Sequence, residues 1–174
     1  MDALTPNNQK APDFTLNDLD GHPHRLADYQ GRIVILNFWS AECPWAQAAD
    51  QELAAHLAEW GEAVTLLPLA SNANEPLTLL ASAARERRLS LVLHDADHRV
   101  ADLYGAQTTP EFFVIDPNGV LCYHGAFDDL TFRQRIPTRT YLPQAVAALL
   151  AGRSPEPAQT SLYGCAIVRQ NIAV

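Results

Sequence analysis

A nearly continuous apolar run that leads into a cysteine constrains the fold of this chain more than any other feature. Residues 33–39 read Ile-Val-Ile-Leu-Asn-Phe-Trp, which is typical of a strand buried on both faces. Cys43 and Pro44 follow, and apolar residues then recur at roughly helical spacing up to Trp60, before Gly61. The sequence therefore predicts a strand, a turn and a helix, with Cys43 at the N-terminus of the helix.

This position indicates a reactive cysteine rather than an inert buried one. The free N–H groups and the dipole at a helix N-terminus favour the thiolate, which is the nucleophile in thiol chemistry. A pKa of about 6.5 instead of about 8.5 would raise the thiolate fraction at neutral pH from about 3% to about 75%. Glu42 opposes this shift, because a neighbouring carboxylate disfavours the thiolate. Ala46 stands where a Cys-x-x-Cys motif would place the second cysteine, so that kind of dithiol exchange is excluded.

Strand and helix patterns alternate along the rest of the chain. Strands are expected at 14–16, 25–26, 64–70, 91–93, 112–115 and 121–124, and helices at 77–88, 100–104 and 142–150. Pro68 is expected to weaken the end of its strand. The run Asp116-Pro117-Asn118-Gly119 indicates a hairpin turn. This order predicts an α/β fold with a largely parallel core and an antiparallel hairpin at one side.

Length, charge and composition limit the class of protein. A chain of 174 residues is expected to form one domain over 11–151, with a flexible N-terminus at 1–10 and a tail at 152–174. The formal net charge of −8 argues against a nucleic-acid partner. No apolar run reaches the roughly 20 residues that span a bilayer, and the first residues lack the pattern of a signal peptide. We therefore expect a cytoplasmic protein without a membrane partner, whose three cysteines do not make a disulfide scaffold.

Several motifs together carry a family resemblance. Residues 38–43, Phe-Trp-Ser-Ala-Glu-Cys, resemble the thioredoxin run Phe-Trp-Ala-x-x-Cys, and residues 11–16 resemble the Ala-Pro-x-Phe-x-Leu opening of redoxins. Thr109-Pro110, taken alone, favours an ordinary trans proline, but it matches the cis-proline signature that faces the reactive cysteine in that family. The chain thus resembles the thioredoxin-like superfamily, in the redoxin branch related to alkyl-hydroperoxide-reductase and thiol-specific-antioxidant proteins. The resemblance covers about 11–151 and implies a central mixed sheet flanked by helices, with an N-terminal β-hairpin extension.

The tail adds a second resemblance. Residues 164–167, Gly-Cys-Ala-Ile, are similar to the C-terminal Gly-Cys-x-Ile of a redoxin subgroup, which implies that Cys165 is a distal resolving partner for Cys43. The alternative is that Cys165 belongs to a small apolar plug against the domain. The residues expected to shape the site around the two cysteines are Trp39, Ser40, Pro44, Trp45, Thr109 and Pro110. The resemblance implies no organic cofactor and no metal.

The resemblance implies a thiol–disulfide oxidoreductase with a protein or small-molecule disulfide as substrate and an external thiol as reductant. One alternative is a peroxiredoxin-like peroxidase that reduces hydroperoxides, an antioxidant activity. Ser40 fits the peroxiredoxin pattern Pro-x-x-x-Thr/Ser-x-x-Cys, but Leu36 occupies the proline position. Arg133 and Arg135 could supply a cation for peroxide, although exposed arginines are the more common case. A further alternative is a binding or redox-sensing module without turnover.

The third cysteine and two histidine-containing segments are interpreted as structural rather than functional. Cys122 lies within an expected strand and is interpreted as a small core residue. The segment 94–98, His-Asp-Ala-Asp-His, is interpreted as a solvated turn rather than a metal site, and so are His22 and His24. The substrate, the electron donor and the oligomeric state do not follow from the sequence.

Overall fold

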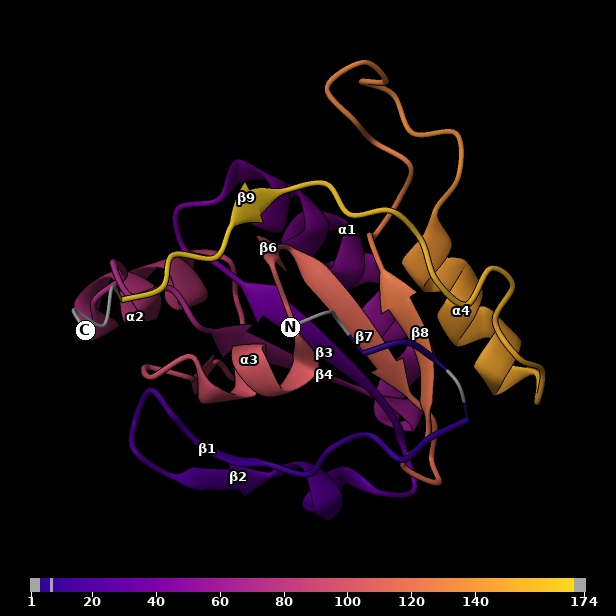
Figure 1. Cartoon of the computed structure of the whole chain (residues 1–174), viewed down its shortest axis with the longest axis horizontal. Helices are drawn as coiled ribbons and strands as arrows, with labels where there is room; N and C mark the ends of the chain where they lie inside the picture. The colour runs from indigo at the N-terminus through magenta and orange to yellow at the C-terminus, as the bar shows by residue number, and fades with distance from the viewer. Residues whose placement is uncertain (1–3, 7, 171–174) are drawn as a thin grey trace.

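The computed structural model describes residues 4–6 and 8–170, in which one seven-stranded sheet and one two-stranded sheet are surrounded by helices (Figure 1). The strands are β1 (Thr15–Asp18), β2 (Pro23–Arg25), β3 (Ile33–Trp39), β4 (Val64–Ala70), β5 (Leu93–His94), β6 (Thr108–Thr109), β7 (Glu111–Ile115), β8 (Leu121–Gly125) and β9 (Cys165–Ala166). The α-helices are α1 (Pro44–Trp60), α2 (Leu77–Glu86), α3 (Arg99–Tyr104) and α4 (Tyr141–Leu150), and short 3-10 turns cover Leu26–Tyr29 and Gly61–Ala63. None of the described helices combines the length and the apolar character that a membrane crossing requires.

The large sheet is mixed and has the strand order β2-β1-β5-β4-β3-β7-β8. Its centre is parallel, because β3 pairs with β4 and β4 with β5 in the same direction. Strands β7 and β8 continue the sheet antiparallel to β3, and the β1–β2 hairpin pairs antiparallel with β5 at the other edge. The predicted fold class, including the N-terminal hairpin, is confirmed.

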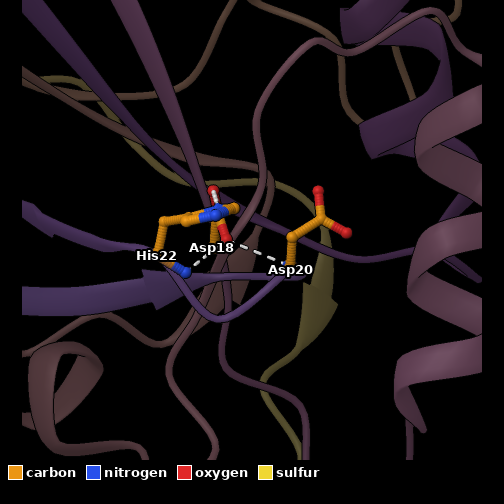
Figure 2. Close-up of side chains that lie close together, drawn as sticks. All are labelled: Asp18, Asp20 and His22. Carbon is orange, nitrogen blue, oxygen red and sulfur yellow. Dashed lines mark hydrogen bonds and ion pairs between the residues drawn. The ribbon is translucent and has the colours of Figure 1, made fainter.

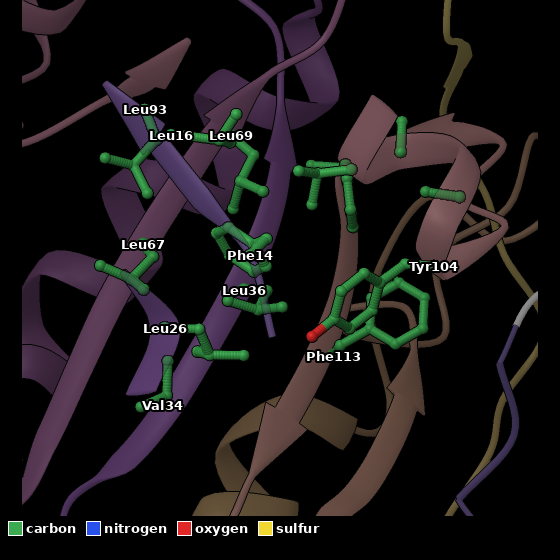
Figure 3. Packing of buried hydrophobic residues seen from close by; sticks show 14 of the residues in the cluster. Phe14, Leu16, Leu26, Val34, Leu36, Leu67, Leu69, Leu93, Tyr104 and Phe113 are labelled. Carbon is green, nitrogen blue, oxygen red and sulfur yellow. The ribbon is translucent and has the colours of Figure 1, made fainter. Parts of the chain in front are cut away.

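Strand β3 runs through the middle of this sheet with all seven residues buried. Its side chains alternate between the two faces, as expected for a strand covered on both sides. Val34, Leu36 and Phe38 belong to the cluster on the face covered by α3, and Ile33 and Ile35 belong to the cluster under α1 and α4. Figure 3 shows the first cluster, in which the rings of Tyr104 and Phe113 pack against the leucines of the central strands.

The strand predicted at 64–70 is confirmed as β4, and Pro68, which was expected to weaken its end, does not shorten it. Strand β4 continues to Ala70 through Pro68, which stands opposite Asn37 of β3 in the register. The proline does not end the strand, because every residue from 67 to 70 is buried and the packing outweighs one missing donor. The strand expected at 91–93 is shorter and lies at Leu93–His94.

The C-terminal tail crosses the molecule to form the second sheet. Strand β9 pairs antiparallel with β6, with Thr108 opposite Ala166 and Thr109 opposite Cys165. In Figure 1 the yellow tail passes from α4 over the end of α1 and continues toward α2. The tail is fixed beyond β9 as well, because Ile167 N donates to Gln107 O at 2.9 Å. The pairing therefore brings a segment more than fifty residues away along the chain onto the loop that precedes β7.

The segment expected to be flexible lies partly outside the described residues, namely residues 1–3 and 7. Within the described part, Leu4 N donates to Tyr104 O at 3.0 Å and its side chain packs against the core. Ala11 N donates to Gly119 O at 2.9 Å, where the main domain is expected to begin.

Candidate active site

Cys43 occupies the N-cap position of α1, directly before Pro44 at the first helical position. Proline is well suited to that position, because its fixed φ matches the helix and its missing N–H would have no helical partner there. The Cys43 N–H donates to Ser40 Oγ at 3.0 Å, which closes the turn between β3 and α1. No acidic residue lies in the first turn of α1, so the positive end of the helix dipole is not opposed from within the helix.

The structure brings Cys43, Thr109 and Cys165 together. Cys43 Sγ lies 2.8 Å from Cys165 Sγ and 3.1 Å from the carbonyl oxygen of Thr109. Both cysteines are free thiols, and the side chain of Cys43 is only 2% exposed. The peptide bond between Thr109 and Pro110 is cis. The two cysteines that the sequence suggested as a pair are thus in direct contact, and Cys165 belongs to the tail that covers Cys43.

The approach of the tail depends on a glycine. A Cβ atom on Gly164 would lie 2.3 Å from Thr109 O and 2.9 Å from Thr109 C. One residue earlier, the ring of Tyr163 packs against Trp45 with a centroid distance of 4.8 Å. Backbone contact at Gly164 and ring contact at Tyr163 together hold Cys165 over Cys43.

Burial raises the pKa of the Cys165 thiol. The pKa of Cys165 is raised from 9.0 to about 12, first by burial and then by the hydrogen bond with Cys43 and the charge that Cys43 carries when ionised. The nearby carboxylate of Glu75 raises the Cys165 pKa further. Cys165 therefore keeps its proton at neutral pH while the tail is docked.

Glu75 is a buried carboxylate that the sequence analysis did not select. It follows β4, whose carboxyl end lies beside that of the parallel strand β3. Its Oε1 accepts hydrogen bonds from Ser40 Oγ at 2.5 Å and from Glu42 N at 3.0 Å. Its Oε2 has no hydrogen-bond partner among the described residues. Glu75 therefore fixes the turn that carries Cys43 and places negative charge near the sulfur pair.

Arg87 supports the same turn from the end of α2. Its guanidinium donates to Ser40 O at 3.0 Å, to Ala41 O, and to Asp50 Oδ2 at 3.2 Å. Asp50 also accepts from Trp39 Nε1 at 2.8 Å, and Arg87 lies 5.1 Å from the centre of the Trp39 ring. Burial raises the pKa of Asp50, while its bonds to Trp39 and Arg87 act in the opposite direction. Trp39 is thus held in the core as part of a polar network.

A second buried carboxylate, that of Glu111, holds β6 in place through hydrogen bonds to its backbone. Glu111 is fully buried, and its Oε2 accepts from Gln107 N at 2.8 Å and from Thr108 N at 2.9 Å. Its Oε1 lies 2.8 Å from Nε2 of His124, which is itself buried and stacks on Phe113. Glu111 therefore holds the loop that presents the Thr109 carbonyl to Cys43.

Other residues considered from the sequence lie away from the sulfur pair. Cys122 is half-buried on β8, and burial raises the pKa of its thiol. Arg133 and Arg135 are exposed, in the loop between β8 and α4. The solvated turn predicted at 94–98 is wrong in part, because Asp95 is fully buried and accepts hydrogen bonds from Ser71 Oγ and from the first residues of α3.

The residues around His22 form a surface turn (Figure 2). Asp18 Oδ1 accepts from the backbone N–H groups of Asp20 and His22, both at 2.9 Å. Asp18 Oδ2 lies 3.3 Å from Nδ1 of His22 and 3.2 Å from Nε2 of His24. These bonds, first the one from the His22 backbone, lower the pKa of Asp18 to about 2. The carboxylate of Asp18 is thus occupied by internal hydrogen bonds, and His24 lies half-buried in β2 rather than in the expected solvated turn.

The comparisons with known proteins concern the fold and the family of the chain. The thioredoxin domain of a thiol-disulfide oxidoreductase from Bacteroides vulgatus matches the structure with a TM-score of 0.61 and 21% identity, over 73% of this chain and 90% of that one. At that identity the likeness concerns the fold, which is thioredoxin-like. The AhpC/TSA family model matches residues 7–124, and the chain belongs to that family.

Two further similarities differ in how much of the chain they cover. The thiol-disulfide oxidoreductase ResA of Geobacillus thermodenitrificans (strain NG80-2) is 35% identical over 112 residues, which are 63% of this chain and 63% of the relative. The crystal structure of a hypothetical protein from Sinorhizobium meliloti 1021 has a TM-score of 0.87 and 28% identity, and it covers 98% of this chain and 97% of that one. The chain thus spans just under two thirds of the length of the curated relative. The match to the Sinorhizobium structure covers nearly all of both chains.

Proposed function

We propose that this protein is a thiol–disulfide oxidoreductase in which Cys43 and Cys165 form the reactive dithiol. The observation that carries the proposal is the 2.8 Å separation of the two sulfurs. A disulfide bond is about 2.05 Å long, so a small movement of the tail would join them. The name of the relative ResA and the membership in the AhpC/TSA family support thiol chemistry at this site.

The reaction begins with attack on an external disulfide. The Cys43 thiolate attacks one sulfur of the substrate, forms a mixed disulfide and releases the other sulfur as a thiolate. Cys165 then passes its proton to solvent and attacks Cys43 Sγ, which forms the Cys43–Cys165 disulfide and releases the second substrate thiolate. Two electrons pass from the dithiol to the substrate. An external thiol reductant returns the protein to its starting state.

The roles of the two cysteines follow from their surroundings. Cys43 stands at a helix N-terminus, where a thiolate is favoured. Cys165 has a pKa raised to about 12, mainly by burial, so it is the thiol that keeps its proton. Because Cys43 is 2% exposed beneath β9, an external disulfide reaches it only after the tail has moved aside. Return of the tail then delivers Cys165 for the second step.

The peroxidase alternative has less support at this site. The hydrogen-bond contacts of Cys43 Sγ among the described residues are Thr109 O and Cys165 Sγ. The guanidinium group that binds this turn, that of Arg87, is directed to backbone carbonyls and to Asp50. An antioxidant activity is therefore the second candidate, and a redox-sensing module without turnover is the third. A cytoplasmic location is also part of the proposal, and fractionation of cells that produce the protein tests it.

Turnover measurements separate these functions. The reduced protein is mixed with bis(2-hydroxyethyl) disulfide or with hydrogen peroxide, and dithiothreitol regenerates it. The proposal expects reduction of the disulfide, loss of turnover in Cys43→Ser and unchanged turnover in Cys122→Ser. Consumption of peroxide without disulfide reduction would favour the peroxidase. Rapid alkylation of Cys43 without either turnover would favour the sensor.

A further inference from the structure

The loop between β8 and α4 is the most prominent surface feature outside the sulfur pair. It projects from the body of the molecule in Figure 1, in orange above α4. We name residues 128–140 the arginine loop. Among the described large hydrophobic residues that are exposed, its Phe132 (64%) and Ile136 (78%) have the highest exposed fractions. Two such side chains on one protruding loop are unusual for a surface without a partner.

The arginine loop also concentrates positive charge. The protein has a net charge of −8 and 12 lysines and arginines in total, yet Arg133, Arg135 and Arg139 lie within seven residues. Arg133 lies over the ring of Phe132, at 5.3 Å from its centre, and Arg135 Nε donates to Phe132 O at 3.2 Å. Aromatic residues and arginines side by side are the combination enriched in protein–protein interfaces.

Internal hydrogen bonds give the loop a defined shape. At its base, Asp129 Oδ1 accepts from Thr138 N at 2.8 Å and from Arg139 N at 3.1 Å. The hydrogen bond from the Thr138 hydroxyl, and after it these backbone bonds, hold the pKa of Asp129 well below its usual range. Near the tip, Thr131 N donates to Gln134 O at 3.0 Å, and Gln134 N donates back to Thr131 Oγ1 at 3.0 Å. The exposed apolar side chains are therefore presented by a closed, hydrogen-bonded loop.

The base of the loop borders the candidate active site. A groove of about 270 Å³ is lined by Leu130 and Pro137 from the loop and by Trp45, Pro110 and Tyr163 from the surroundings of Cys43. A protein bound at the loop tip would therefore extend along this groove toward the thiol. Glu52 and Asp128 also line the groove, so carboxylates lie at the base of the loop, whereas Arg133 and Arg135 lie beside Phe132 near its tip.

We propose that the arginine loop docks the polypeptide that exchanges disulfides with Cys43, and that this partner carries acidic and apolar side chains in the part that contacts the loop tip, several residues from its cysteine. Acidic groups there complement Arg133 and Arg135, and an apolar side chain or hollow covers Phe132 and Ile136. An anionic lipid surface fits less well, because the protein as a whole is acidic and the loop leads to a thiol. This inference rests on the proposed function, because it specifies the substrate of the same site.

The test uses two synthetic peptides that each carry one cysteine as a 2-pyridyl disulfide, with glutamates and leucines, or lysines and leucines, placed several residues away from it to reach the loop tip. Cys43 displaces 2-thiopyridone, which is followed by absorbance. A 2-pyridyl hydroxyethyl disulfide is the small reference substrate. Each rate is divided by the rate of the same compound with dithiothreitol, which removes differences in intrinsic reactivity. The ratio of peptide rate to reference rate then reports on docking alone.

We expect the glutamate peptide to react about tenfold faster than the lysine peptide at low salt, and less so at high salt. The double variant Arg133→Glu/Arg135→Glu should reverse this preference, and Phe132→Ser/Ile136→Ser should lower the ratio for both peptides. Arg153→Glu and Leu103→Ser, at exposed positions outside the loop, are the matched controls. Equal ratios for the parent protein and both loop variants would overturn the inference.

Two further measurements complete the test. Loop-dependent binding to phosphatidylglycerol vesicles would overturn the inference in favour of a lipid contact, and loop-dependent dimerisation in sedimentation would overturn it in favour of self-association. Absence of both supports it. If the protein does not react with the 2-pyridyl hydroxyethyl disulfide, the proposed function itself has failed, whatever the rates with the peptides.

Discussion

Gly164 lies so close to Thr109 that a Cβ atom on it would stand 2.3 Å from the carbonyl oxygen of Thr109. The contact is between backbone atoms, which a flexible side chain cannot relieve. It lies one residue before Cys165, directly before the β6–β9 pairing. The position of the second sulfur therefore depends on the absence of a side chain at its neighbour.

The substitution Gly164→Ala should displace the tail without unfolding the domain. Alkylation of Cys43 by iodoacetamide should become at least about tenfold faster. The added methyl group disfavours the docked tail, and the tail is therefore released from Cys43 a larger fraction of the time. Mass spectrometry of the labelled peptides measures the rate. Ser161→Ala, an exposed tail position, is the control. A Gly164→Ala protein that is alkylated no faster than its parent would contradict the described contact.

The raised pKa of Cys165 predicts a pH dependence of tail docking. Docking raises the pKa of this thiol from 9.0 to about 12, first by burial and then by contact with Cys43. The docked tail therefore binds the proton more tightly than the released tail does. The contribution of this thiol to docking is present below pH 9 and is lost as pH rises toward 12.

Tryptophan emission can follow this release, because the ring of Trp45 contacts Tyr163 of the tail. Cys165→Ser is the comparison, since a hydroxyl group does not titrate in this range. Tyrosine ionisation affects both proteins equally and is removed by the comparison. An identical pH profile in the two proteins would show that Cys165 does not control the release.

Glu111 is expected to stabilise the fold through the β6 loop. Glu111→Ala leaves the N–H groups of Gln107 and Thr108 without their acceptor and leaves His124 without its partner. Removal of one member of a buried ionic network costs about 3–5 kcal/mol. Urea denaturation measures the loss in free energy of unfolding. Glu111→Gln, which keeps one acceptor oxygen, should lose distinctly less, and equal losses in the two variants would refute this role.

Arg87 gives a separate prediction about the turn that carries Cys43. Arg87→Met leaves the buried Asp50 without its cationic partner and the carbonyls of Ser40 and Ala41 without a donor. The expected cost is about 3 kcal/mol in the free energy of unfolding. Arg85→Met, on the exposed side of the same helix, should change the free energy by less than about 0.5 kcal/mol. If Arg87→Met lowers the free energy of unfolding no more than Arg85→Met does, the hydrogen bonds of Arg87 do not stabilise the fold.

The sequence was most informative where the pattern is local. The strand at 33–39 and the helix from Pro44 could be predicted because periodicity and a proline at the first helical position act within a few residues. The strand at 64–70 was also predicted with its observed bounds, although Pro68 was expected to weaken its end. Asp95 was misread as solvated, because its hydrogen-bond partners come together only when α3 packs beside β4.

The candidate site was predicted less completely. Cys165 lies 122 residues from Cys43, and only the resemblance of the Gly-Cys-x-Ile tail suggested the pairing. Glu75 could have been suspected, because it follows a strand that is parallel to β3 and ends at the same edge. Arg87 left no such signal, because its role consists of hydrogen bonds to backbone carbonyls in a distant turn. Contacts of this kind depend on the assembled fold.

The central claim is that Cys43 and Cys165 act as one dithiol, and peptide mapping by mass spectrometry tests it most directly. The reduced protein is mixed with one equivalent of bis(2-hydroxyethyl) disulfide, quenched with acid and digested without reduction. The account predicts a peptide pair linked through residues 43 and 165, and a hydroxyethyl mixed disulfide on Cys43 when Cys165→Ser is used. A mixed disulfide on Cys43 that persists in the parent protein, with Cys165 still a free thiol, would contradict it.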